Sequence, residues 1–176
     1  MAPAVTPPPG RLVRLGVVLA GEPGAARRLA QLCDLAGIDV VWAIDEVTAA
    51  DVAGVVSRAA VEVLPASDEP WARTVPVSIG RTWAEAAARA DLDPTFQGYG
   101  RPAEVGLFGR LEECQAQVVA LAHQGVTDLR CVLPDAPDVH DVVAQLTAVA
   151  IGSLATHHPD APRSPDPPAP PWASPR

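Results

Sequence analysis

The stretch Gly109–Asp135, GRLEECQAQVVALAHQGVTDLRCVLPD, decides the fold, because it runs from a helix through a glycine stop into a buried strand. An earlier stretch, Ala30–Asp45 with the sequence AQLCDLAGIDVVWAID, repeats this design: an apolar-faced helix ends at Gly37, and a short hydrophobic strand finishes on an acid. Helix-then-strand units of this kind are typical of parallel α/β sheets. The sequence therefore predicts an α/β fold with mainly parallel strands.

Composition limits the size of the fold and the class of partner. The chain has 176 residues, of which 48% are hydrophobic and 19% charged, so it can bury one ordinary core as a single domain. Its net charge of -8 and the absence of a basic stripe on any expected helix argue against nucleic acid, whose phosphates favour clustered cations. We therefore expect no nucleic-acid partner.

The cysteines and the apolar runs bear on the compartment. Cys33, Cys114 and Cys131 are widely spaced and form no C-x-x-C pair, which favours reduced core thiols over a disulfide framework or a zinc site. No apolar run approaches the roughly 20 residues that cross a bilayer, and the first residues lack a signal-peptide pattern. We expect a cytoplasmic protein without membrane contact.

Proline-rich segments bound the expected domain. Residues 1–10 and 157–176 lack the apolar density that offsets the entropy of ordering, so we expect disordered tails there and an ordered α/β domain over residues 11–156. A proline-rich tail can also serve as a polyproline ligand, but a solvated end is the favoured reading.

The periodicity of apolar residues predicts the elements. A buried strand over Leu12–Leu19 precedes a helix over Ala25–Ala36, and a second strand covers Val40–Ile44. Pro76 argues for a strand end or a sheet edge in the stretch Thr74–Ile79. The other expected elements are a helix opened by a capping box of Thr48 and Asp51, a strand over Val61–Leu64, a helix opened by Thr82 and Glu85, a helix over Leu111–Gln124, a strand over Leu129–Leu133 and a helix from Asp138 to about Ala155.

This pattern gives five strands at most, with a loop over Asp93–Gly109. An eight-stranded barrel with its helices takes about 250 residues, so this chain is too short to close one. A partial barrel, a small open sheet and half of an assembly are all compatible with the count. Partial barrels expose sheet edges, so we expect a homo-oligomer or pairing with a related chain that hides them.

Three segments, in this order, resemble the bacterial luciferase-like flavin monooxygenase family. They are LGVVLA followed by ARRLAQLCDLAGIDVVWAID, then SIGRTWAEAAARADLDP, then GLFGRLEECQAQVVALAHQGVTDLRCVLP. The resemblance implies a (β/α)8 TIM-like barrel and FMN or a deazaflavin coenzyme. Fewer than 30 residues stand between Asp45 and Thr74, where the family has its central strands and helices, so the chain resembles a shortened member.

Asp45 and Glu46 are the candidate catalytic residues. They follow an expected parallel strand, at the edge where such sheets gather active-site groups, and two carboxylates can hold a cofactor hydroxyl or exchange a proton. The family often has a histidine after the acid, whereas this chain has Glu46. The alternative is a solvated acidic turn that caps the following helix.

The candidate cofactor-binding residues lie in two places. Gly80, Arg81 and Thr82 open a helix after a strand, where N–H groups and a guanidinium can meet a phosphate, although simple helix capping is the alternative. Trp42 is a candidate wall for a flavin ring, or an ordinary core aromatic. The turn Gly21–Gly24 is a weaker phosphate candidate, because Glu22 would repel the anion.

Two further groups of residues are weaker candidates. Asp135, Asp138, His140 and Asp141 contain oxygen and imidazole ligands, but helix capping is the favoured role and we expect no metal. A loop with Phe96, Tyr99 and Phe108 is a possible lid or a passive connector.

The resemblance thus implies a flavin- or deazaflavin-dependent oxidoreductase or monooxygenase acting on a small organic substrate. The alternative is a non-catalytic shortened relative that binds flavin or a protein partner. A third reading, from fold analogy alone, is a small ligand-binding protein outside the family.

Overall fold

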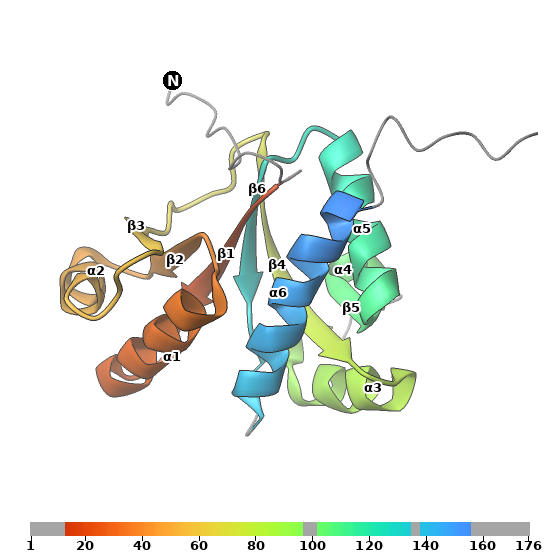
Figure 1. Cartoon of the computed structure of the whole chain (residues 1–176), viewed down its shortest axis with the longest axis horizontal. Coiled ribbons are helices and arrows are strands. Elements are labelled where there is room, and N and C mark those ends of the chain that lie inside the picture. The colour runs from red at the N-terminus through yellow and green to blue at the C-terminus, as the bar shows by residue number, and fades with distance from the viewer. Residues whose placement is uncertain (1–12, 97–101, 135–137, 156–176) are drawn as a thin grey trace, which may run out of the picture.

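In a computed structural model, which describes residues 13–96, 102–134 and 138–155, the chain forms one open six-stranded sheet with helices on both faces (Figure 1). The strand order is β3-β2-β1-β6-β4-β5, and every pair of neighbouring strands is parallel. The predicted proline-rich tails, the lid candidate Tyr99 and Asp135 lie outside the described residues.

The strands are β1 (Arg14–Leu19), β2 (Val40–Ala43), β3 (Ala60–Val63), β4 (Ala72–Gly80), β5 (Leu107–Arg110) and β6 (Asp128–Val132). The helices are α1 (Pro23–Ala36), α2 (Glu46–Ala53), α3 (Trp83–Leu92), α4 (Pro102–Val105), α5 (Leu111–His123) and α6 (Val139–Ala155), and a 3-10 turn covers Pro94–Phe96.

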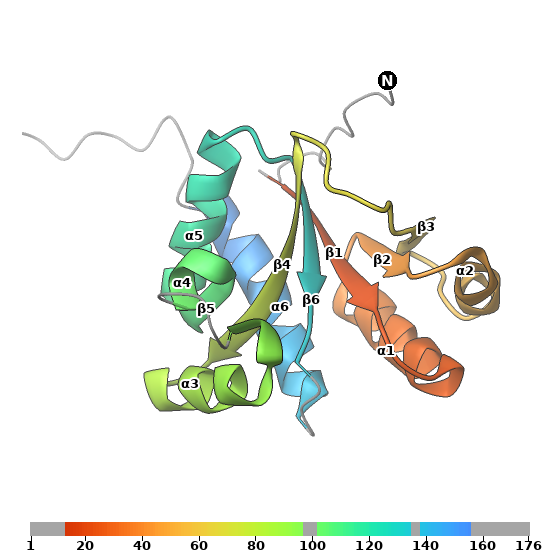
Figure 2. The same cartoon turned by 180° about the vertical axis from the view of Figure 1, so that it is seen from behind.

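The main core lies on one face of the sheet, under α1, α2, α5 and α6. Along β1, the alternate residues Leu15, Val17 and Leu19 point into this core. Figure 1 looks onto this face, with α1 and α6 in front of the strands, and Figure 2 shows the same helices behind β1 and β6. Apolar burial on this face is the main stabilising term of the fold.

The opposite face is divided in two. Over β4 and β5 it is covered by α3, whose Ala86 and Ala90 pack with Phe96 and Phe108. Over β1, β2 and β6 it carries a smaller apolar cluster around Trp42 together with buried charged side chains. Helices therefore cover the two faces unequally.

The prediction of parallel helix-then-strand units is confirmed. Both β2 and β6 run parallel to β1, with Val17 beside Val41 on one side and beside Cys131 on the other. The α/β class is also confirmed, and the sheet is compatible with part of a barrel but is not closed. The predicted end of α1 at Gly37 is also confirmed, because Gly37 adopts a φ of 83°, a conformation that favours glycine.

Two sequence-based expectations about the strands are wrong. The sheet has six strands and not five, because the expected loop over Asp93–Gly109 contains α4 and most of β5. The strand containing Pro76 is no sheet edge, since β4 pairs with β6 over its first half and with β5 over its second. Pro76 lies where the pairing with β6 ends, so it is tolerated inside the sheet.

The start of α2 also differs from the prediction. Thr48 and Asp51 do not form the cap, because the helix begins earlier and Asp45 is its N-cap. The side chain of Asp45 accepts a hydrogen bond of 2.7 Å from the Thr48 N–H. Asp45, which follows the predicted strand, is thus also the residue that begins the next helix.

Candidate functional site

A cleft of about 640 Å³ lies at the carboxyl ends of β1 and β6, and we call it the β1–β6 cleft. Parallel sheets bind ligands at this edge, and the volume falls within the range of small-molecule sites. Its walls are mainly apolar and come from both flanking helices. The apolar lining includes Leu29 and Leu32 of α1, Leu133 after β6 and Val139 of α6.

The polar lining of the cleft favours a ligand with an anionic group. Three ionisable side chains line it, namely Glu22, Arg28 and His140. The amino-terminal turns of α1 and α6 also border it, and helix N-termini carry a partial positive charge. Glu22 opposes this field. The arrangement therefore suits an apolar body with an anionic end near Arg28.

The predicted catalytic pair does not line this cleft. Asp45 and Glu46 are exposed at the end of β2. Hydrogen bonding from the Thr48 backbone lowers the pKa of Asp45, so the capping carboxylate is held in its charged form. This contact is the one expected if Asp45 is an acidic helix cap, which is the alternative interpretation. A catalytic role for the pair stays a prediction.

The predicted phosphate-binding turn at Gly80, Arg81 and Thr82 forms a closed capping arrangement. Thr82 Oγ1 accepts a hydrogen bond of 3.2 Å from the Glu85 N–H, and a Glu85 oxygen accepts one of 2.8 Å from the Arg81 N–H. A Cβ added at Gly80 would lie 2.5 Å from the Ala86 nitrogen, so the turn is tight. These contacts use two of the N–H groups that a phosphate would need.

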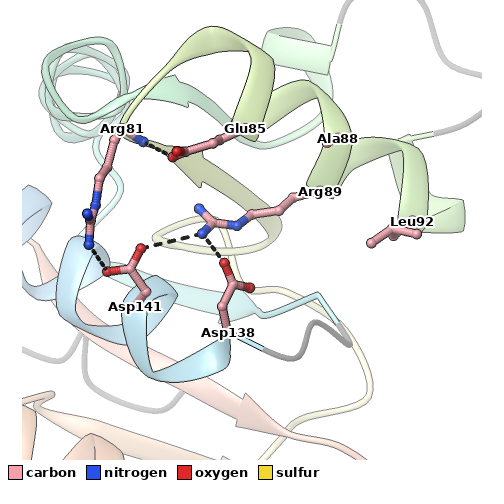
Figure 3. Close-up of a pocket in the computed structure, with 7 residues that line it drawn as sticks. All are labelled: Arg81, Glu85, Ala88, Arg89, Leu92, Asp138 and Asp141. Atoms are coloured by element: carbon pink, nitrogen blue, oxygen red, sulfur yellow. Dashed lines mark hydrogen bonds and ion pairs between the residues drawn. The ribbon is translucent and has the colours of Figure 1, made fainter.

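A second, shallower pocket of about 650 Å³ lies between α3 and the start of α6, and its ionic groups pair with one another (Figure 3). Arg81 Nη2 lies 2.8 Å from an Asp141 oxygen, and the buried Arg89 pairs with both Asp138 and Asp141. The hydrogen bond to Arg81 lowers the pKa of Asp141. Because carboxylates neutralise both guanidiniums, this pocket is a poor anion site.

Trp42 lies on the other face of the sheet from α1 and is not among the residues that line the β1–β6 cleft. The guanidinium carbon of Arg130 lies 4.4 Å from the centroid of the Trp42 ring, and that of Arg14 lies 5.6 Å from it. Gly16 makes room for it, since a Cβ there would lie 2.4 Å from the indole nitrogen. The contacts are those of a core aromatic.

Three carboxylates, of which only Asp128 is buried, complete this charged face. Arg130 is 1% exposed and pairs with Asp68 at 3.2 Å and Glu69 at 2.9 Å. The fully buried Asp128 lies 3.5 Å from Arg130 Nε. Burial raises the pKa of Asp128, and the charges of Arg130 and Arg14 partly oppose that rise.

The structure also places the candidate metal ligands. Asp138 and Asp141 face arginines, whereas His140 lines the β1–β6 cleft. Within the three described ranges, no group of three or more histidine, cysteine or acidic side chains is placed to hold a metal ion. The cysteines are buried, and burial raises the pKa of Cys33 and Cys114 to about 12.

Sequence reasoning missed Arg28 and His140 as site residues. Arg28 sits on the polar side of an amphipathic helix, and His140 stood out only as a metal candidate. The signal that could have found them is their position in α1 and α6, the helices that directly follow two neighbouring parallel strands.

Comparisons of the chain with protein-family models, with curated proteins and with solved structures returned no match. Among the described helices, none combines the length and the apolar character needed to cross a membrane.

Proposed function

We propose that the protein is a luciferase-like flavin- or deazaflavin-dependent oxidoreductase that binds its cofactor in the β1–β6 cleft. The observation that carries the proposal is the position of this cleft, at the carboxyl ends of two adjacent parallel strands with an arginine at its rim. The resemblance to the luciferase-like family supports the choice of cofactor.

The lining of the cleft fits such a cofactor. Leu29, Leu32 and Leu133 would pack against the flat ring and exclude water from it. Arg28 would bind the phosphate, helped by the positive ends of α1 and α6. Glu22 disfavours a second anionic group close to the first.

When bound, the flavin or deazaflavin ring supplies the ability to accept or donate a hydride. The imidazole of His140 lies in the same cleft and can give or take a proton at a ring nitrogen. A small organic substrate would enter beside the apolar wall.

A second candidate function is cofactor binding without turnover. The observation that favours it is the exposure of Asp45 and Glu46 outside the cleft, with Asp45 engaged as a helix cap. In that case the chain binds flavin or a protein partner and catalyses no reaction.

Titration of the full chain with FMN and with a deazaflavin, followed by visible absorbance, tests the binding step. We expect saturable uptake, and Arg28→Gln should raise the dissociation constant about tenfold. Arg27→Gln is the matched control, because Arg27 is the neighbouring residue of α1 but pairs with Asp51 at 3.3 Å outside the cleft. Equal weakening by both variants, or no uptake of either cofactor, would refute the proposal.

A separate measurement distinguishes the two candidate functions. The loaded protein is mixed with small alcohols, amines and aldehydes, and the oxidation state of the cofactor is followed by its absorbance. Turnover that survives Asp45→Asn and Glu46→Gln but not His140→Gln would assign proton transfer to the cleft. Uptake with no change of oxidation state in any mixture favours the non-catalytic relative.

A further inference from the structure

The two edges of the sheet differ in how their backbone groups are satisfied. At the β5 edge, the side chain of Gln117 accepts a hydrogen bond of 3.0 Å from the Phe108 N–H and donates one of 2.9 Å to the Phe108 carbonyl. The amide of Gln117 thus closes this edge as a neighbouring strand would. Edge strands without such protection are templates for pairing with another chain.

The β3 edge has no equivalent cap among the described residues. The N–H groups of Ala60 and Leu64 donate hydrogen bonds to the backbone carbonyls of Asp39 and Ala43. The backbone N–H and carbonyl groups of the even-numbered residues along β3 therefore point toward β2. Backbone direction alternates along a strand, and Val61 and Val63 therefore point their N–H and carbonyl groups away from the sheet. These are two donors and two acceptors in a row on an outer strand.

We infer that β3 pairs antiparallel with β3 of a second copy of this chain, about a two-fold axis at Glu62, to form one continuous twelve-stranded sheet. In this register Val61 of one copy faces Val63 of the other, and the two residues exchange both backbone hydrogen bonds. Symmetry repeats the exchange on the other side of the axis. No other partner is needed to satisfy the edge.

Side chains around the edge favour a copy of the same chain. Val63 is 42% exposed, and two apolar residues that follow the neighbouring strand β2, Ile44 and Val47, are 51% and 80% exposed. Antiparallel pairing brings this carboxyl end of β3 toward the amino end of its copy. The same pairing brings opposite charges together: Arg58, which precedes β3 in one copy, approaches the carboxyl end of the strands in the other copy, where Asp45 and Glu46 lie.

The register has one electrostatic cost. It places the two Glu62 side chains opposite each other across the axis, and like charges in such a pair are destabilising. Each Glu62 carboxylate forms an ion pair with Arg14 of its own chain. This internal pairing reduces the repulsion between the two copies.

Sedimentation velocity of the full chain over a range of concentrations tests the inference. We expect a monomer–dimer equilibrium, and Val61→Pro should raise its dissociation constant at least about tenfold, since it removes one outward N–H from each copy. Proline at this position leaves the β2-facing hydrogen bonds of β3 in place. Val63→Lys is a second variant, which adds a charge at the interface without touching the backbone.

Circular dichroism confirms that each variant is folded, and Leu35→Lys, at an apolar residue of α1 that is 81% exposed, is the matched control. A chain that stays monomeric at every concentration overturns the inference. A dimer that tolerates both Val61→Pro and Val63→Lys also overturns it, because its interface then lies elsewhere. The outcome does not depend on cofactor binding, so it stands or falls separately from the proposed function.

Discussion

The Asp34→Asn substitution removes one negative charge from the junction that ties α1 to the start of β3. Asp34 lies in the last turn of α1 and is 7% exposed. One carboxylate oxygen accepts hydrogen bonds of 2.6 Å and 2.7 Å from the N–H groups of Arg58 and Ala59, and the other accepts one of 3.0 Å from the Ser57 hydroxyl. These three contacts hold the chain before β3 against the helix.

The magnitude follows from the protonation of this carboxyl. Burial alone would raise its pKa, but the N–H donors of Ala59 and Arg58 and the contacts with Ser57 outweigh burial and lower the pKa from 3.8 to about 2. A pKa lowered by folding stabilises the folded state above the unfolded pKa, and this stabilisation is lost as the pH falls through the folded pKa. The shift corresponds to about 2 kcal/mol of unfolding free energy at neutral pH.

Urea unfolding, followed by tryptophan fluorescence between about pH 6 and about pH 2, measures the effect. Asparagine keeps one acceptor oxygen, so Asp34→Asn should lower the free energy of unfolding by about 2 kcal/mol at pH 6 and by much less at pH 2. Asp34→Ala also leaves buried N–H groups unpaired and should cost about 4 kcal/mol. Parallel pH profiles for the wild type and Asp34→Asn would refute the reasoning.

Three further predictions concern the buried residues. Gly16→Ala should lower the free energy of unfolding by about 1 to 3 kcal/mol in urea titrations, because its Cβ would overlap the indole of Trp42; an unchanged value would contradict the packing. Burial raises the pKa of Asp128 above its unfolded value, so the charged carboxylate destabilises the fold as pH rises. The free energy of unfolding of Asp128→Asn should therefore increase relative to that of the wild type between about pH 4 and pH 7. If the difference between the two proteins decreases over this range, the pKa of Asp128 is not raised. The three cysteine thiols should react with a thiol reagent only as fast as the chain unfolds, and fast labelling of the native protein would show that they are accessible.

Sequence patterns with local causes predicted the fold well. The strand at β1 and the helix α1 follow from apolar periodicity and from the stop at Gly37. The strand β5 was missed, because four residues that include Gly109 carry no periodicity. The strand order was also beyond the sequence, since nothing local places β6 between β1 and β4.

The candidate site was predicted less well, and the reason is physical. Asp45 and Thr82 were recognised as groups at strand ends, but the same positions are helix N-caps, and capping occupies both side chains. Arg28 and His140 come together only because β1 and β6 are neighbours in the sheet. A site formed between elements distant in sequence leaves no spacing pattern to read.

Amide chemical-shift mapping during addition of FMN or a deazaflavin tests the central claim most directly, because it shows where the cofactor binds. The account predicts shifts at Gly21, Arg28 and Leu32 and at His140, around the β1–β6 cleft. Shifts centred on the pocket between α3 and α6, or no shifts at all, would contradict it.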